Sequence, residues 1–465
     1  MDTQQSIPDR SRTVTGAFVF LALSVVFCLF PFNIAFAVNP YDILDQHIDA
    51  IGGLEKLRSV KTRHSTGTIL YDDLQGRFQT WQEKPLRYRK EVDFSVIKYV
   101  EGDSGEQSWL LDTNGRVLIH RDRQTIKRRQ VQKLLEEFEH LNPTSPYFSL
   151  QYVKQTSVGQ RECYLLTLTN TINSDRLQYY FDTDSFFMVK SAFTTPDLKT
   201  VSVYDDFRVV DGIIMPFHTV TTYHPIGKIE ETRITHYTIN TKSPPEAFSV
   251  PASKKDYSFP RGQNSTSVSF VIKGNLIYLP VTIKDDTQKW LVDSGSSMSV
   301  IDKAYANDLG LLEKGGIRGH GFGGLFNLGF AAIPEYRLAD IRLQHQRVYT
   351  LEGLKENSYE PQVFGILGYD FLSRFVVEID FDDKSMTFHE PKSFTYHGTG
   401  HIVDAPLKYR TFTLPVKLDK ISTGPWSVDL GAHQSSLHYP FAKDNELLRR
   451  DGVKTVSKGA AGHSF

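Results

Sequence analysis

The sequence predicts a mainly β protein in two parts, on three features. Aromatic residues make up 12% of the 465 residues, a composition that favours strands. Between residues 66 and 250, short strand-like runs alternate with polar turns, as at 163–169 and 177–182. Further along, a strand that leads into an aspartate occurs twice. A chain of this length is expected to form two or three domains.

Composition and charge exclude several classes of protein. Hydrophobic residues make up 40% and charged residues 23%, which is close to globular averages and unlike disordered or multi-span membrane proteins. The 53 basic residues nearly balance the 54 acidic ones. No nucleic-acid partner is predicted, because binding a polyanion needs a clustered basic surplus. The two cysteines, Cys28 and Cys163, cannot make a disulfide framework.

Residues 1–37 have the pattern of a secretory signal peptide. Arg10 and Arg12 precede an apolar run from 16 to 30, and small residues at 35–37 flank a cleavage point. The run is shorter than the ~20 residues of a spanning helix, although an uncleaved membrane anchor is the alternative. Export without disulfides favours a bacterial periplasm.

A first domain, rich in strands, is predicted over residues 38–252. Asn39 and Pro40 begin a helix, and a later helix has an apolar face. That face consists of Val131, Leu134, Leu135, Phe138 and Leu141. The basic run at 121–133 is either a binding patch or, as we favour, a solvated helix face. Many consecutive strands with one helix predict a large, curved antiparallel sheet.

The segment Ala-Ile-Gly-Gly-Leu-Glu-Lys-Leu at 50–57, with the meander strands after it, resembles the outer-membrane lipoprotein carrier family. The resemblance covers about residues 40–250 and implies a half-barrel over acyl chains, with a lipid or lipoprotein ligand. No clustered acids, metal-ligand spacing or nucleophile pair occurs in this stretch, so we expect a binding or positioning domain. The polar composition of 253–266 predicts a linker.

An aspartate motif opens the second part. A strand at 277–283 and a second apolar run lead to Asp293, which is followed by Ser294, Gly295 and Ser296. Desolvation at the end of a buried strand raises the pKa of a carboxylate, so that a second acid can share its proton. The two serines can hydrogen-bond the carboxylates and the loop, and Gly295 permits a tight turn.

The features after this motif extend the pattern. The glycine-rich segment 319–324 predicts a hairpin tip that lies over a substrate as a flap. Its glycines are Gly319, Gly321, Gly323 and Gly324. Residues 364–368 then place two apolar residues before a glycine, and a short helix and two strands follow up to residue 389. The order resembles a retropepsin-like lobe of the aspartic protease clan, covering residues 267–392.

An internal repeat supplies a second acid. The Leu-Pro-Val core of the entering strand, at 279–281, occurs again at 414–416. Residues 426–432 then repeat the first motif and put Asp429 in the place of Asp293, with a tryptophan three residues before each. A duplication explains how one chain provides two facing carboxylates. One stays protonated while the other takes a proton from water, as the resemblance implies.

The second lobe, residues 396–465, departs from the family pattern. Gly431 matches Gly295, but Leu430 stands where the family has Ser or Thr. The second apolar-apolar-Gly segment and the closing strands are absent, so we expect this lobe to be truncated. The resemblance thus predicts a pepsin-clan β domain of two retropepsin-like lobes, the second incomplete.

The function predicted is that of an aspartic-type endopeptidase acting on peptide or protein substrates. The predicted site has Asp293 and Asp429 as its dyad and Ser294, Gly295, Ser296 and Gly431 in the active loops. The alternative is a non-catalytic periplasmic protein that binds lipid or lipoprotein on a protease-like scaffold. A homodimer that uses Asp293 twice also remains open.

No cofactor or metal is predicted. His397 and His401 have the spacing of helical metal ligands, but the glycines between them disfavour a helix.

Overall fold

The computed structural model describes residues 38–173, 175–195, 198–321, 324–357, 362–408, 410–419, 421–449, 457–459 and 462–464. The predicted signal peptide lies outside these residues. No helix among them is long and apolar enough to cross a membrane. Strands dominate the described chain, which confirms the predicted fold class.

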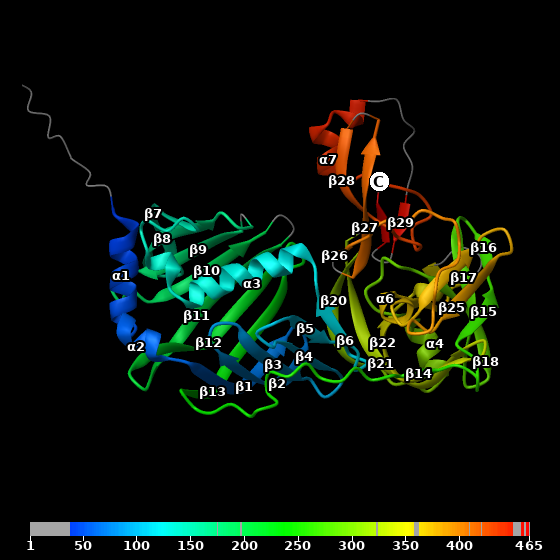
Figure 1. The fold of residues 1–465 in the computed structure, drawn as a ribbon, viewed down its shortest axis with the longest axis horizontal. Coiled ribbons are helices and arrows are strands. Elements are labelled where there is room, and N and C mark those ends of the chain that lie inside the picture. The colour runs from blue at the N-terminus through cyan, green and yellow to red at the C-terminus, as the bar shows by residue number, and fades with distance from the viewer. Residues whose placement is uncertain are drawn as a thin grey trace, which may run out of the picture. The chain divides into compact units, whose positions relative to one another are not determined.

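Strands β1 to β13 form one antiparallel sheet in the first part of the chain (Figure 1). Its order is β6-β5-β4-β3-β2-β1-β13-β12-β11-β10-β9-β8-β7. The chain starts at β1 in the middle of the sheet and runs outward to β6 at one edge. It continues at β7 on the other edge and returns inward to β13, which pairs with β1. The bounds are β1 Thr62–Tyr71, β2 Leu74–Glu83, β3 Arg87–Asp93, β4 Lys98–Asp103, β5 Ser108–Leu111, β6 Val117–His120, β7 Phe148–Val158, β8 Arg161–Asn170, β9 Arg176–Asp182, β10 Met188–Thr194, β11 Lys199–Val210, β12 Ile213–His224 and β13 Lys228–Ile239. The predicted large antiparallel sheet is confirmed.

Helices α1 (Pro40–Ala50), α2 (Leu54–Ser59) and α3 (Arg123–Glu136) accompany this sheet. Helix α1 begins where predicted, because the Asn39 side chain accepts a hydrogen bond from the Tyr41 amide. Helix α3 begins after Asp122, whose carboxylate accepts from the Thr125 amide. It ends before the last residues of the predicted apolar face, since Phe138 takes a left-handed φ of 63° and a 3-10 turn, η1 (Glu139–Leu141), follows.

Helix α3 is tied to the sheet by ion pairs, and a cavity of about 630 Å³ lies between them. Arg129 of α3 pairs with Asp103 of β4 at 2.5 Å, and Glu136 pairs with Arg63 of β1 at 3.3 Å. Arg128 and Arg129 line this cavity. The predicted solvated face agrees with Arg128, whose side chain is 45% exposed, but not with Arg129, whose side chain is 19% exposed and paired with Asp103.

The first lobe contains a mixed sheet in the order β14-β22-β19-β23-β18-β17-β21-β20, with β16 paired to β17, and a small sheet β15-β25-β24. Strands β18 and β23 are parallel, as are β19 and β22. The bounds are β14 Tyr257–Ser258, β15 Ser265–Ser269, β16 Val271–Lys273, β17 Leu276–Ile283, β18 Asp286–Val292, β19 Val300–Asp302, α4 Lys303–Asp308, β20 Lys314–Gly321, β21 Gly324–Leu338, β22 Ile341–Leu351, α5 Leu354–Asn357, β23 Gly365–Leu367, α6 Tyr369–Leu372, β24 Val376–Asp380 and β25 Ser385–His389.

The segment predicted as a linker contributes to this lobe. Strand β14 pairs with β22. Asp256 forms an ion pair with Arg374 at 2.5 Å, and both side chains are almost completely buried. We therefore propose that the lobe begins at Asp256 instead of residue 267.

The second lobe repeats the first hairpin of the first lobe. Leu414 of β27 is opposite Trp426 of β28, as Leu279 of β17 is opposite Trp290 of β18. The elements are β26 Leu407–Lys408, β27 Thr411–Leu418, β28 Ile421–Ser427, α7 Tyr439–Asp444, η2 Leu447–Arg449, β29 Ser457–Gly459 and β30 Gly462–Ser464. The two hairpins therefore have the same register at these pairs, and the second hairpin then shifts its register between Pro415 and Lys417.

Two half-buried histidines, His47 of α1 and His140 of η1, pack against aromatic rings of the first domain. The Nδ1 atom of His47 is 2.8 Å from the carbonyl oxygen of Phe186. The His140 ring lies beside Phe148, and its Nδ1 atom is buried without a hydrogen-bond partner. Burial lowers the pKa of His47 to about 4. Burial, with a smaller contribution from His47, lowers the pKa of His140 to about 4.

We expect the protein to lose stability as the pH falls from 6.5 toward 4. In that window the unfolded histidines bind protons that the folded ones exclude, so acid favours unfolding. Thermal unfolding at about pH 7.5 and about pH 4.5 measures the effect. A variant with His47→Gln and His140→Gln should lose less stability between the two conditions; an equal loss would contradict this explanation.

Candidate active site

The first active loop follows the buried strand β18. The Asp293 amide donates to the Leu367 carbonyl of β23 at 3.0 Å. The amides of Gly295 and Ser296 donate to Asp293 Oδ1 at 2.8 and 2.9 Å. The carboxylate is thus fixed by the sheet behind it and by two backbone donors of its own loop. The Ser296 hydroxyl donates to the Met298 carbonyl at 2.8 Å and closes the loop.

The second active loop follows β28 and has matching hydrogen bonds. The Gly431 amide donates to Asp429 Oδ1 at 2.8 Å, as the Gly295 amide does to Asp293. The Ala432 amide is 3.3 Å from the Asp429 carbonyl oxygen, a distance equal to that from Ser296 N to Asp293 O. The two aspartates therefore occupy equivalent positions in two copies of one loop.

Each aspartate packs against the glycine of the opposite loop. A Cβ atom on Gly295 would lie 2.6 Å from Asp429 Oδ2, and one on Gly431 would lie 2.6 Å from Asp293 Oδ1. Any larger residue at either glycine would overlap a carboxylate. The structure therefore brings together the two acids that the sequence singles out, with the two predicted glycines between them.

Ser294 joins the two loops from one side only. Its hydroxyl donates to the Val428 carbonyl at 2.8 Å and accepts from the Leu430 amide at 3.0 Å. The Ser294 side chain is buried. Leu430 has no hydroxyl group that could form the equivalent hydrogen bonds to the first loop. It packs instead against the apolar core of the first lobe. The second loop is therefore held by one hydroxyl and by an apolar contact.

The pairing changes the acid strength of the site. Burial, then the charge of Asp429 and a hydrogen bond from it, raise the pKa of Asp293 to about 7. The amides of Ser296 and Gly295 oppose this rise. Two carboxylates in contact cannot both ionise at low cost, so the pair holds one proton over a wide pH range.

A buried carboxylate that the sequence did not single out supports the first loop. Asp370 of α6 accepts from the Ser299 amide at 2.6 Å and from its hydroxyl at 2.7 Å. The same hydroxyl accepts from the Gly368 amide at 3.1 Å. The Tyr369 amide donates to the Ser296 carbonyl at 2.8 Å. An acid in the apolar run around residue 370 is a sequence signal that could have indicated this role.

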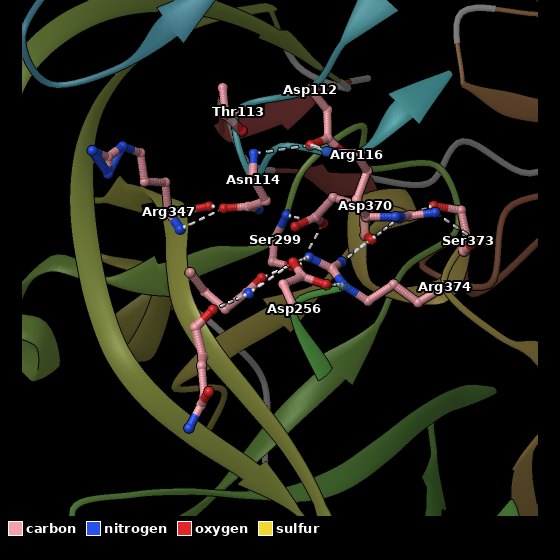
Figure 2. A network of polar contacts seen from close by, with 12 residues as sticks. Asp112, Thr113, Asn114, Arg116, Asp256, Ser299, Arg347, Asp370, Ser373 and Arg374 are labelled. Atoms are coloured by element: carbon pink, nitrogen blue, oxygen red, sulfur yellow. Dashed lines mark hydrogen bonds and ion pairs between the residues drawn. The ribbon is translucent and has the colours of Figure 1, made fainter. Parts of the chain in front are cut away.

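Helix α6 is also contacted from the first domain, as Figure 2 shows. Arg116, at the turn between β5 and β6, donates to the carbonyls of Asp370 at 2.9 Å and Ser373 at 2.8 Å. Its partners lie more than 250 positions away in the sequence, so no local pattern could have indicated them. Asn114 of the same turn accepts from the Arg347 amide at 2.8 Å.

The predicted flap glycines lie on the β20–β21 hairpin. Gly319 is opposite Phe326 and Gly321 is opposite Gly324. Gly323 lies outside the described residues. Within the described part of the chain, no group of three or more His, Cys, Asp or Glu residues is arranged to hold a metal ion.

Comparison with known proteins gives one family match and several similar solved structures. Residues 279–371 match the aspartyl protease family model. A retropepsin-like aspartic protease from Rickettsia conorii is similar, with 16% identity, a TM-score of 0.22, and coverage of 27% of this chain and 99% of the other. A LolA superfamily protein from Nitrosomonas europaea matches with 15% identity and a TM-score of 0.32, over 46% of this chain and 98% of its own. No curated protein gives a match. The family match includes Asp293 and ends before Asp429.

We expect Ser294→Ala to loosen the second loop. The change leaves the Leu430 amide and the Val428 carbonyl without their partner, a cost of about 1–3 kcal/mol for buried groups. Hydrogen exchange of the Leu430 amide should accelerate. Ser296→Ala is the matched control, because it removes a hydrogen bond within the first loop only. If the two variants leave Leu430 equally protected, Ser294 does not join the loops.

Proposed function

We propose that the protein is an aspartic-type endopeptidase and that Asp293 and Asp429 form its dyad. The observation that carries this proposal is the packing of each carboxylate against the opposite glycine, where a Cβ atom would lie 2.6 Å from a carboxylate oxygen. Such contact forces the pair to share a proton. The family match over residues 279–371 supports the same reaction class.

The dyad divides the chemistry between its two members. The ionised carboxylate takes a proton from a water molecule, whose oxygen then attacks the carbonyl carbon of the peptide bond. The protonated carboxyl group hydrogen-bonds the carbonyl oxygen as negative charge develops there. When the tetrahedral intermediate collapses, the carbon–nitrogen bond breaks and the leaving nitrogen takes up a proton from the dyad. The β20–β21 hairpin covers the bound substrate.

The intrachain pair is favoured over a homodimer. In this chain the place opposite Asp293 is taken by Asp429, and the Leu430 amide beside it is bonded to Ser294. A second copy of the first lobe would have to displace this loop. We therefore propose that one chain supplies both acids.

We expect Asp293→Asn and Asp429→Asn each to reduce cleavage of a peptide mixture by about 10²–10⁴-fold, because an amide cannot activate water. Wild-type activity should decline as the pH rises through about 7, where the dyad loses its shared proton. Mass spectrometry of the digests over a pH series measures both effects.

Controls separate this proposal from its alternatives. Asp285→Asn changes an exposed aspartate of the same lobe and should leave cleavage unchanged. Asp293→Asn should raise the unfolding temperature at neutral pH, because it removes an acid that the fold makes harder to ionise. Loss of cleavage in Asp293→Asn alone would indicate a symmetric dimer. Equal cleavage by wild type and both dyad variants would refute the assignment.

The cavity of the first domain supports a second function, the binding of an amphiphile. Its lining combines apolar side chains with cations that already have ion-pair partners. The apolar members are Trp109, Val131, Leu135, Leu177 and Phe193. We propose that a lipid or lipoprotein acyl chain contacts these residues while its polar end meets the ion pairs. Each buried methylene would contribute about 0.8 kcal/mol. We further propose export to a periplasm, on the pattern of residues 1–37.

We expect the full chain to bind a fluorescent fatty acid and Leu135→Trp to weaken that binding, because the larger side chain fills the cavity. Ile126→Trp is the matched control on the same helix, since Ile126 is exposed. Titration of the probe measures affinity. Protein that ignores the probe and carries no lipid on extraction would remove this second function.

A further inference from the structure

An apolar cluster joins the first domain to the β20–β21 hairpin of the first lobe. We refer to it as the interdomain cluster. Its buried members from the first domain are Ile69, Leu74, Phe78, Val92 and Phe94. Its buried members from the lobe are Val300, Ile317, Leu328, Phe330, Leu351 and Ile366. Ile317 lies on β20, and Leu328 and Phe330 lie on β21, so the base of the hairpin belongs to this cluster.

The strands of the first domain are built to present this apolar surface. Phe78 is opposite Gly67 on one side and Val92 on the other, so the three share one face. A Cβ atom on Gly67 would lie 2.8 Å from the Phe78 ring, and one on Gly76 would lie 2.7 Å from the Phe94 ring. Glycine at these positions therefore leaves room for the two aromatic rings.

A polar contact fixes the hairpin beside the cluster. Asp72, at the turn between β1 and β2, accepts from the Arg318 amide at 3.0 Å and from Arg318 Nη2 at 2.9 Å. The Asp72 side chain is 4% exposed. At Gly315, with φ of 65°, a side chain would overlap Leu74. The base of the hairpin is thus held by a buried carboxylate and by a close backbone approach.

The hairpin is also linked to the first active loop through the sheet. Phe330 of β21 is opposite Tyr349 of β22, and Tyr349 is paired with Val300 of β19. Strand β19 begins directly after the loop that carries Asp293. Leu291, two residues before Asp293, also packs against the interdomain cluster. A shift of the hairpin base would therefore change the packing on both sides of the loop.

We propose that the first domain positions the hairpin for substrate binding and that Asp72 and Arg318 are the positioning residues. This inference rests on the proposed peptidase function, since the hairpin covers substrate only in that function. Neither residue acts on the substrate itself. Asp72 acts through Arg318, whose backbone is part of β20 three residues from the glycine at the end of that strand. The interdomain cluster provides the apolar support for this contact.

The test removes the polar contact and leaves the cluster intact. Arg318→Met keeps the aliphatic stem but loses the guanidinium, and Asp72→Asn keeps the volume of the carboxylate. Arg337→Met is the matched control, because Arg337 lies at the far end of β21 and pairs with the exposed Asp285. Two measurements are made on the full chain: hydrogen exchange of the hairpin amides, and KM and kcat for a peptide substrate.

We expect Arg318→Met to accelerate exchange of amides in residues 314–321 by about tenfold and to raise KM by a similar factor, with kcat within about twofold. Asp72→Asn should change both in the same direction, and Arg318→Lys should restore part of the effect. Unchanged exchange in both variants, or an effect equal to that of Arg337→Met, would overturn the inference. Acceleration throughout the chain would also overturn it, because it would indicate general unfolding.

The same experiment separates the two proposals. If the wild-type chain cleaves no peptide, the peptidase function fails, and hydrogen exchange still decides whether Asp72 and Arg318 hold the hairpin. If the wild type cleaves peptides and exchange accelerates without a change in KM, the positioning inference alone is wrong.

Discussion

Two carboxylates that repel each other must be held in contact, and the rest of the second part of the chain is organised around this constraint. Asp293 and Asp429 each pack on the glycine of the opposite loop. Burial, and then the charge of Asp429 and a hydrogen bond from it, raise the pKa of Asp293 to about 7, so ionisation of this carboxyl group lowers the stability of the fold at neutral pH. The buried strand β18 and the backbone donors of Gly295 and Ser296 supply the rigidity that resists this repulsion.

The support of the two loops is unequal. The first loop is tied to β23 and α6, through the Leu367 carbonyl and the Asp370 carboxylate. The second loop depends on Ser294 and on the contact of Leu430 with the core of the first lobe. At Leu430, apolar packing therefore stands in the place where a hydroxyl group could form a second hydrogen bond between the loops. The position of the second loop is therefore fixed by contacts that the first lobe supplies.

The sequence predicts those parts of the site that local pattern encodes. The strand-Asp-Ser-Gly motif and its repeat identify Asp293 and Asp429, because a buried strand that ends in an acid is visible over ten residues. The predicted extent of α3 is wrong, since the left-handed Phe138 interrupts an otherwise periodic run. The contacts of Asp72 with Arg318 and of Arg116 with α6 are not predictable in this way. They join positions 246 and 254 residues apart, and each residue alone resembles an ordinary surface charge.

The surface of the first-domain sheet has two parts: one packs against the first lobe, and the other lines the cavity under α3. The apolar side chains around Phe78 and Phe94 pack on the lobe, so they are not accessible to a lipid. The remaining cavity, under α3, is lined by ion pairs such as that of Arg129 with Asp103. Part of the apolar face of this sheet is therefore covered by the neighbouring lobe. Strands β1 to β3 carry residues of the cavity and also residues of the interdomain cluster, so they connect that cavity to the support of the hairpin.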